Sequence, residues 1–183
     1  MQEVPSNTSS TLASAIEKLA KHIEKWANGA NQYDTEIPGL RFSRWATPTP
    51  PTSYTHNPSI CLIAQGRKRV LLGEDSFVYD ANHFLISSVD LPIIANIIEA
   101  SEDKPYLGVI MELDLTEISQ LIVDSELTFN QSKEAQKGIA VGELSEPLLD
   151  AFLRLIELLD EGQSIKILAP IIKREIFYRL LIT

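Results

Sequence analysis

The stretch of residues 59–88 constrains the fold of this chain more than any other part of the sequence. It contains short runs rich in apolar and β-branched residues, separated by segments with turn chemistry. The runs are residues 60–64, 70–72, 77–79 and 84–86. A glycine in the connection 73–76 is a hairpin signal, and Asp80 and Asn82 favour a second turn. Short strands at this spacing predict an antiparallel meander that closes into a β-barrel or jelly roll.

Further strand-like runs lie on both sides of this stretch, at residues 40–46, 93–99 and 106–113. The segment 47–58 carries four of the ten prolines. Because proline cannot donate to a β-ladder, this segment is predicted as an extended loop or an edge strand at one end of the barrel.

The apolar period changes from two to about 3.6 after residue 114, which predicts helices. They are expected at residues 116–123, 145–160 and 165–181, with a possible short strand at 139–141 and an N-terminal helix at about 12–27. Pro170 predicts a break or a new helix start near Ala169. We therefore expect an α+β fold with a helix or arm at 1–30, a barrel at 31–114 and a helical part at 115–183.

The composition limits the partners of this chain. A net charge of −9 and a pI near 4.8 argue against direct binding to nucleic acid or to an anionic membrane, because phosphate contacts need clustered Lys and Arg. The single cysteine, Cys61, excludes an internal disulfide. Neither a signal peptide nor a run long enough to span a membrane is recognisable. We expect a cytoplasmic protein.

The histidines give little support for metal chemistry. They are His22, His56 and His83, and no two of them have the close spacing typical of metal ligands. A site made from His56, His83 and a distant acid such as Glu112 is conceivable, but the spacing does not favour it. No glycine-rich phosphate loop is present. We therefore predict no metal, no cofactor and no enzymatic activity.

A small-molecule site inside the barrel is the more informative hypothesis. Arg44 alternates with apolar neighbours on residues 40–46, and an arginine directed into a barrel needs a carboxylate, a carbonyl or a ligand. Trp45, Tyr54 and Tyr79 could supply flat apolar walls. The predicted ligand-binding set consists of Arg44, Trp45, Tyr54, Cys61, Tyr79 and His83.

Two other features have a simpler interpretation. Cys61 lies between apolar residues and is better explained as a small buried hydrophobe than as a reactive sensor thiol. The basic tract Arg67, Lys68 and Arg69 could be an anion site, but consecutive side chains alternate between the faces of a strand. Solvated strand ends explain the tract better.

The order of these parts resembles a known family. The segments NPSICLIAQGRKRVLLGEDSFVYDANHFLISSVDLP and EASEDKPYLGVIMELD, followed by LLDAFLRLIELLD and LAPIIKREIFYRLL, are similar to the N-terminal regulatory domain of AraC-type bacterial transcriptional regulators. The resemblance covers roughly residues 35–183. It implies a cupin-like barrel that senses a small effector, a helical part used for dimerisation, and a separate C-terminal helix-turn-helix domain that binds DNA. The sugar-contacting pattern of the founding member and the metal motifs of enzymatic cupins are not recognisable here.

These observations lead to one main hypothesis and two alternatives. The main hypothesis is an effector-binding and dimerisation domain that controls transcription, in which an unidentified small molecule changes how the barrel, or the N-terminal arm, contacts the helical part. DNA would be bound only by a C-terminal domain outside this chain, which ends in mid-pattern as a truncated polypeptide would. The alternatives are a metal-dependent cupin enzyme and an assembly module without an effector.

The expected dimer contact is the apolar stripe of the predicted helix at 145–160. The stripe is wider than one contact with the barrel requires. Its proposed contact residues are Leu148, Phe152, Leu155, Ile156 and Leu159. The alternative is that the stripe packs entirely on its own barrel.

Overall fold

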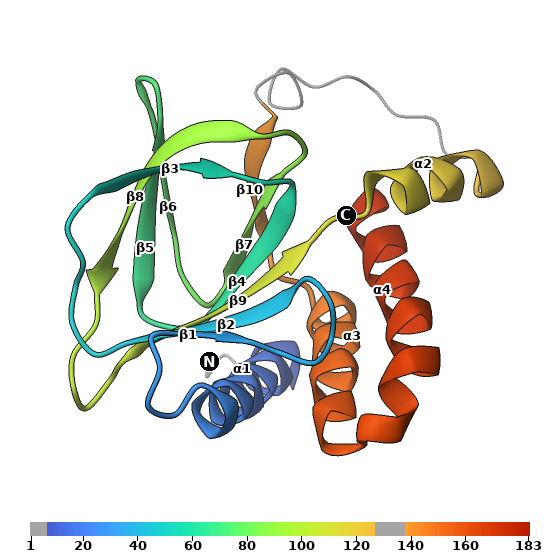
Figure 1. Cartoon of the computed structure of the whole chain (residues 1–183), viewed down its shortest axis with the longest axis horizontal. Helices are drawn as coiled ribbons and strands as arrows, with labels where there is room; N and C mark the ends of the chain where they lie inside the picture. The colour runs from blue at the N-terminus through green and yellow to red at the C-terminus, as the bar shows by residue number, and fades with distance from the viewer. Residues whose placement is uncertain (1–6, 127–137) are drawn as a thin grey trace, which may run out of the picture.

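Two antiparallel sheets face each other and enclose the interior of a barrel (Figure 1). A computed structural model describes residues 7–126 and 138–183 of the chain. The larger sheet has the order β1-β2-β9-β4-β7-β10 and the smaller one the order β3-β8-β5-β6. The strands are β1 (Gln32–Asp34), β2 (Leu40–Trp45), β3 (Thr52–His56), β4 (Ser59–Gln65), β5 (Arg67–Leu72), β6 (Asp75–Tyr79), β7 (His83–Ser87), β8 (Leu91–Glu99), β9 (Tyr106–Glu112) and β10 (Ile139–Glu143).

The helices lie on the outer side of the larger sheet, and α1 packs directly on it (Figure 1). α1 contacts β2, β4, β9 and α3, while α3 packs against α4 and α4 against α2. The helices are α1 (Asn7–Trp26), α2 (Leu115–Asp124), α3 (Glu146–Glu157) and α4 (Ile165–Leu181), with short 3-10 turns at Leu158–Asp160 and Gly162–Ser164. None of the described helices is long and apolar enough to cross a membrane.

The larger sheet is therefore buried on both faces, and β4 shows this most clearly. Cys61 and Ile63 point into the barrel and join its apolar core. Ile60, Leu62 and Ala64 point the other way and join the core formed with the helices. Six consecutive residues of this strand are buried for this reason. A continuous apolar run is what a sheet covered on both sides requires.

The strand and helix predictions are largely confirmed. Every predicted run is a strand or helix in the structure, and β3 lies at the edge of its sheet, as the prolines required. Asp114 caps α2, because its side chain accepts hydrogen bonds from the backbone N–H groups of Thr116 and Glu117. The predicted short strand near 139–141 is β10, which pairs with β7 and extends the larger sheet.

Two details of the prediction are wrong. Residues 32–34 form the strand β1, which the sequence pattern does not predict, because three residues give too little periodicity. Pro170 does not break the last helix, and α4 continues through it. Pro170 lies near the N-terminal end, where the missing N–H removes a single intrahelical hydrogen bond.

The predicted dimer stripe on α3 packs within its own chain. Leu148, Phe152, Leu155 and Ile156 are 0% exposed and Leu159 is 7% exposed, all in the core shared by the helices and the sheet. These residues have no surface left for a partner, so the expectation that they form a dimer contact is wrong. The stripe is wide because it packs against α1 and α4 at once, in a core that also includes apolar residues of the sheet.

The turn from β4 to β5 carries the chain from one sheet to the other at Gly66. Its φ is +87°, a conformation that favours glycine, and a Cβ at this position would lie 2.5 Å from the carbonyl oxygen of Glu99. Gly73, in the β5–β6 turn, also has a positive φ of +58°, but a Cβ there would meet nothing within 4 Å.

We expect Gly66→Ala to destabilise the fold by about 3 kcal/mol or more, because the new methyl group meets backbone as well as adopting a strained φ. Gly73→Ala is the matched control and should cost only about 1 kcal/mol, the strain of φ alone. Urea unfolding followed by circular dichroism measures both changes. Equal losses in the two variants would show that the contact with Glu99 does not matter.

Candidate functional site

A cavity of about 460 Å³ opens inside the barrel between the two sheets. Residues of β1, β2, β4 and β9 line it from one sheet and residues of β3, β5 and β8 from the other. Its apolar and aromatic wall consists of Trp45, Tyr54, Ala95, Ile97, Tyr106 and Ile110. Its polar groups belong to Gln32, Arg41, Ser43, Thr49, Thr52, Thr55, His56, Asn57, Ser59, Lys68, Asn96 and Glu112. Cavities of this size and mixed lining are typical of small-molecule sites.

The strands β2 and β9 supply the cavity through simple alternation. On β2, Arg41, Ser43 and Trp45 line the cavity, whereas Leu40 and Phe42 belong to the core beneath the helices. On β9, Tyr106, Ile110 and Glu112 line it, whereas Leu107, Val109 and Met111 belong to the core beneath the helices. Each strand thus has a cavity-lining face and a helix-packing face.

A buried hydrogen-bond network fixes one wall of the cavity at the corner between β3 and β4. The hydroxyl groups of Ser59 and Ser87 both donate to the carbonyl oxygen of Asn57, at 2.8 and 3.0 Å. The Ser59 Oγ also lies 3.0 Å from His56 Nε2. Because the single Ser59 proton is already donated to Asn57, Oγ accepts and Nε2 carries the proton. His56 is therefore held as the neutral Nε2–H tautomer.

The electrostatic surroundings keep His56 neutral. Burial, and after it the positive charges of Lys68 and Arg41, together lower its pKa to about 4. His56 is 6% exposed. The imidazole is thus a fixed, uncharged hydrogen-bonding group in the cavity wall.

Two cations line the cavity from opposite sheets, Arg41 on β2 and Lys68 on β5. The Lys68 ammonium donates to the Tyr54 hydroxyl at 3.4 Å. Burial by itself lowers the pKa of Lys68, but the neighbouring Tyr106, Tyr54 and Cys61 raise it above its ordinary value. Lys68 is therefore charged at neutral pH.

Cys61 and Tyr79 lie behind the wall and do not line the cavity. Both are buried in the barrel core, and the Cys61 Sγ is 3.9 Å from His56 Nε2. Burial raises the pKa of the Cys61 thiol, although Lys68 opposes the shift, and burial likewise raises the pKa of Tyr79. A protonated and enclosed thiol fits the structural interpretation of this cysteine.

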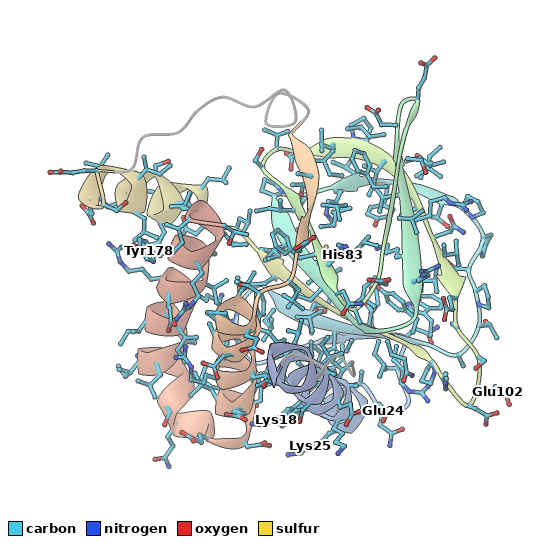
Figure 2. The ribbon with its side chains drawn as sticks, turned by 180° about the vertical axis from the view of Figure 1, so that it is seen from behind. Lys18, Glu24, Lys25, His83, Glu102 and Tyr178 are labelled. Atoms are coloured by element: carbon cyan, nitrogen blue, oxygen red, sulfur yellow. The ribbon has the colours of Figure 1, made fainter. Side chains whose placement is uncertain are left out.

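The structure brings together only part of the predicted ligand-binding set. Trp45 and Tyr54 line the cavity. Arg44 does not, because it shares the helix-side face of β2 with Leu40 and Phe42, and the expectation that it points into the barrel is wrong. His83 lies outside the cavity and is 2.9 Å from the Asp80 carboxylate through Nδ1; Figure 2 marks its position.

Sequence reasoning missed Arg41 and Lys68. Either face of β2 carries one arginine, so the choice between Arg41 and Arg44 depended on which face the helices cover. Lys68 was grouped with Arg67 and Arg69 as a solvated tract, although alternation had already separated it from them. Arg67 and Arg69 are exposed, whereas Lys68 is partly buried. The alternation of side chains along the strand is the signal that identifies Lys68 as the inward residue.

The metal hypothesis receives no support from the described part of the chain. No group of three His, Cys, Asp or Glu side chains is arranged there to hold a metal ion. Of the three residues considered, His56 and Glu112 line the cavity and His83 does not.

The family of this chain is assigned from its sequence, over most of its length. The model of the AraC-type transcriptional regulator N-terminus matches residues 36–183. The chain belongs to this family. No curated protein sequence matches the chain significantly. The matched region includes the complete barrel from β2 onward and the helices α2, α3 and α4.

The fold of this AraC-type domain is supported by one solved structure, and two more distant ones are given for comparison. An apo lysine-to-alanine variant of ToxT from Vibrio cholerae superposes with a TM-score of 0.52 at 10% identity, over 80% of this chain and 57% of that one. The AraC-like transcriptional activator CuxR gives 0.43 at 15% identity, over 80% and 52%. The cupin domain of Drosophila melanogaster CENP-C gives 0.32 at 16% identity, over 44% and 65%. The chain spans little more than half the length of the two regulators, and its fold is the predicted α+β arrangement of a cupin-like barrel with helices.

We expect NMR titration of the AraC-type domain to show His56 neutral down to about pH 5, with a midpoint near its lowered pKa of about 4. The unfolded chain binds this proton at a pKa of about 6.5. The contribution of neutral His56 to stability is therefore present above pH 6.5 and is lost as the pH falls through 4. A midpoint at or above 6.5 for the His56 ring would contradict the buried, cation-flanked environment.

Proposed function

We propose that this domain binds a small-molecule effector in the barrel cavity and, as a dimer, uses that binding to control a DNA-binding domain outside the chain. The observation that carries the proposal is the cavity of about 460 Å³ with its mixed apolar and polar wall. A barrel that served only as an assembly module could fill its interior with its own side chains. Membership of the regulator family favours sensing over catalysis, and a cytoplasmic location agrees with it.

A route from the cavity to the helices supports the proposal. Glu112 lines the cavity at the end of β9, and Lys173 of α4 lies within its electrostatic reach. The Lys173 ammonium also donates to the carbonyl oxygen of Pro38, which precedes β2. Burial lowers the pKa of Lys173, while Glu112 and Asp114 act in the opposite direction. A ligand that changes the position of Glu112 thereby changes how α4 is held against the barrel, and such differential contact is what coupling requires.

Trp45 offers a direct test of occupancy. The chain has two tryptophans, and the buried Trp26 Nε1 has no hydrogen-bond partner among the described residues, so Trp26→Phe removes no bond and leaves Trp45 as the only indole. In this variant, a metabolite extract separated from its proteins should change the indole emission in a saturable way.

The matched control is Trp45→Phe, in which the remaining Trp26 lies outside the cavity and should not respond. Native mass spectrometry of the gently purified domain should show the same ligand as a mass difference that disappears on denaturation. Equal responses of both single-tryptophan variants would argue against binding in the cavity.

The helix α4 supplies the surface that we propose for dimerisation. Ile167, Ile171 and Tyr178 are 66%, 61% and 41% exposed, and Ile182 follows at 52%. They recur at intervals of four and seven residues and so form one stripe on the side of the helix away from Ile176 and Phe177, which are buried. Figure 2 shows Tyr178 on α4 beside α2 and away from the barrel.

A second copy of this chain fits this α4 stripe. Two copies related by a twofold axis place the same apolar positions against each other. Arg174 occupies the middle of the stripe, where two like charges would meet, but its guanidinium is already paired with Glu117 and with Asp124 at 2.8 Å. The repulsion between the copies is thereby reduced.

We expect Ile171→Asp to convert a dimer into a folded monomer, because an exposed apolar position tolerates the charge while a desolvated interface does not. Val78→Asp is the control, since Val78 is 46% exposed on β6 of the barrel, away from the helices. Sedimentation velocity, together with circular dichroism, measures mass and folding. A dimer that persists in Ile171→Asp would place the contact on another surface.

A further inference from the structure

We propose that the effector is a small organic acid whose carboxylate is bound between Lys68 and Arg41. This inference rests on the proposed function and specifies the ligand class of the same cavity. The two cations come from opposite sheets and line one cavity, so a ligand inside it can reach both.

Lys68 lacks the counterion that a charged group in this position requires. In the part of the chain that the structure describes, no carboxylate lies within ion-pair distance of its ammonium, and its one hydrogen bond goes to the Tyr54 hydroxyl at 3.4 Å. Its neighbour Arg67, on the outer face, is 3.7 Å from Asp80 and 3.6 Å from Glu99. Within the tract, the exposed Arg67 therefore has carboxylate partners and the inward Lys68 has none among the described residues. A desolvated charge without a partner is costly unless a ligand supplies the opposite charge.

Arg41 is also incompletely satisfied. Its Nε is buried without a hydrogen-bond partner, and the nearest carboxylate, at 3.7 Å, belongs to Asp34, whose side chain is 89% exposed. An ion pair of this length with a solvated partner contributes little. A guanidinium in this state can donate to a bound carboxylate.

The acid within the cavity lining does not neutralise these cations. Glu112 is exposed at the end of β9, and its side chain packs against the Gly39 position and acts on Lys173 of α4. Both cations also depress the pKa of His56, so their fields overlap at the same wall. The inner part of the cavity is therefore positive, although the chain as a whole is acidic.

The remaining wall determines the body of the ligand. Trp45, Tyr106, Ile97 and Ile110 provide apolar and aromatic surface, and the cavity volume of about 460 Å³ holds one small molecule. A monocarboxylic acid with a short apolar or aromatic body satisfies both parts of the lining. It requires neither a phosphate loop nor a metal ion.

The test compares acids with their neutral amides. The pairs are benzoate and benzamide, 3-phenylpropionate and 3-phenylpropionamide, indole-3-acetate and indole-3-acetamide, and hexanoate and hexanamide, titrated into the domain by calorimetry. We expect at least one acid to bind about tenfold or more tightly than its amide, because charge-assisted hydrogen bonds are the stronger kind. The preference should depend only weakly on the salt concentration, because partly buried charges are screened much less than exposed ones.

Variants assign the preference to the cavity. Lys68→Met should reduce the ratio of acid to amide affinity to near one, whereas Lys68→Arg should retain a preference. Arg69→Met is the matched control, because it removes the same charge from the exposed face of the same strand and should leave the ratio unchanged. Thermal unfolding of each variant shows that it is folded.

The outcomes separate the two proposals. Amides that bind as tightly as their acids, or a preference that Lys68→Met and Arg69→Met change equally, would overturn the organic-acid inference and leave effector sensing intact. Failure of every acid and every amide to bind, together with the absence of a ligand adduct in native mass spectrometry, would overturn both.

Discussion

The burial of the larger sheet on both faces is the constraint on which the rest of this structure depends. One face closes the barrel, and the other packs against α1, which in turn packs against α3. Each fully buried Leu, Ile or Phe side chain contributes roughly 1.5–3 kcal/mol. The helices are therefore part of the folding unit, because without them the residues Phe42, Leu62 and Val109 would expose an entire apolar face. This explains why the apolar stripe of α3 is buried within its own chain.

The same constraint joins the candidate site to the helices. On β2, Arg41, Ser43 and Trp45 line the cavity. Phe42, which lies between Arg41 and Ser43 in the sequence, packs beneath the helices. Ile110 lines the cavity as well, and its neighbours Val109 and Met111 face the helical core. A strand is too stiff to move one of its faces alone, and packed cores resist deformation. Under the proposed function, a ligand that displaces β2 or β9 must also displace the packing of α1 and, through α1, that of α3.

The sequence predicts this fold well because its information is local. Turn residues and alternation locate the strands, and the change of period locates the helices. The errors concern tertiary placement. Arg41 and Arg44 differ only in parity, and β2 is apolar on neither face, so nothing local shows which arginine enters the barrel. The α3 stripe predicts burial correctly, but the sequence does not say whether a barrel or a second chain covers it. Lys68 is different, because the alternation of side chains along the strand already places it on the opposite face from Arg67 and Arg69. The basic composition of the tract favours the wrong interpretation, in which all three are solvated.

The charge of the cavity acquires its meaning from the charge of the whole domain. A chain with a net charge of −9 repels an organic anion at long range, and at physiological ionic strength this repulsion is screened beyond about 8 Å. Approach is therefore not assisted by the domain, and any preference for an acid has to arise inside the barrel, where Lys68 and Arg41 are partly desolvated and screening is weak. A cationic surface would attract acids of every kind, nucleic acids included. Two cations enclosed in an acidic domain restrict that attraction to molecules small enough to enter the barrel, which is the selectivity that the proposed function requires.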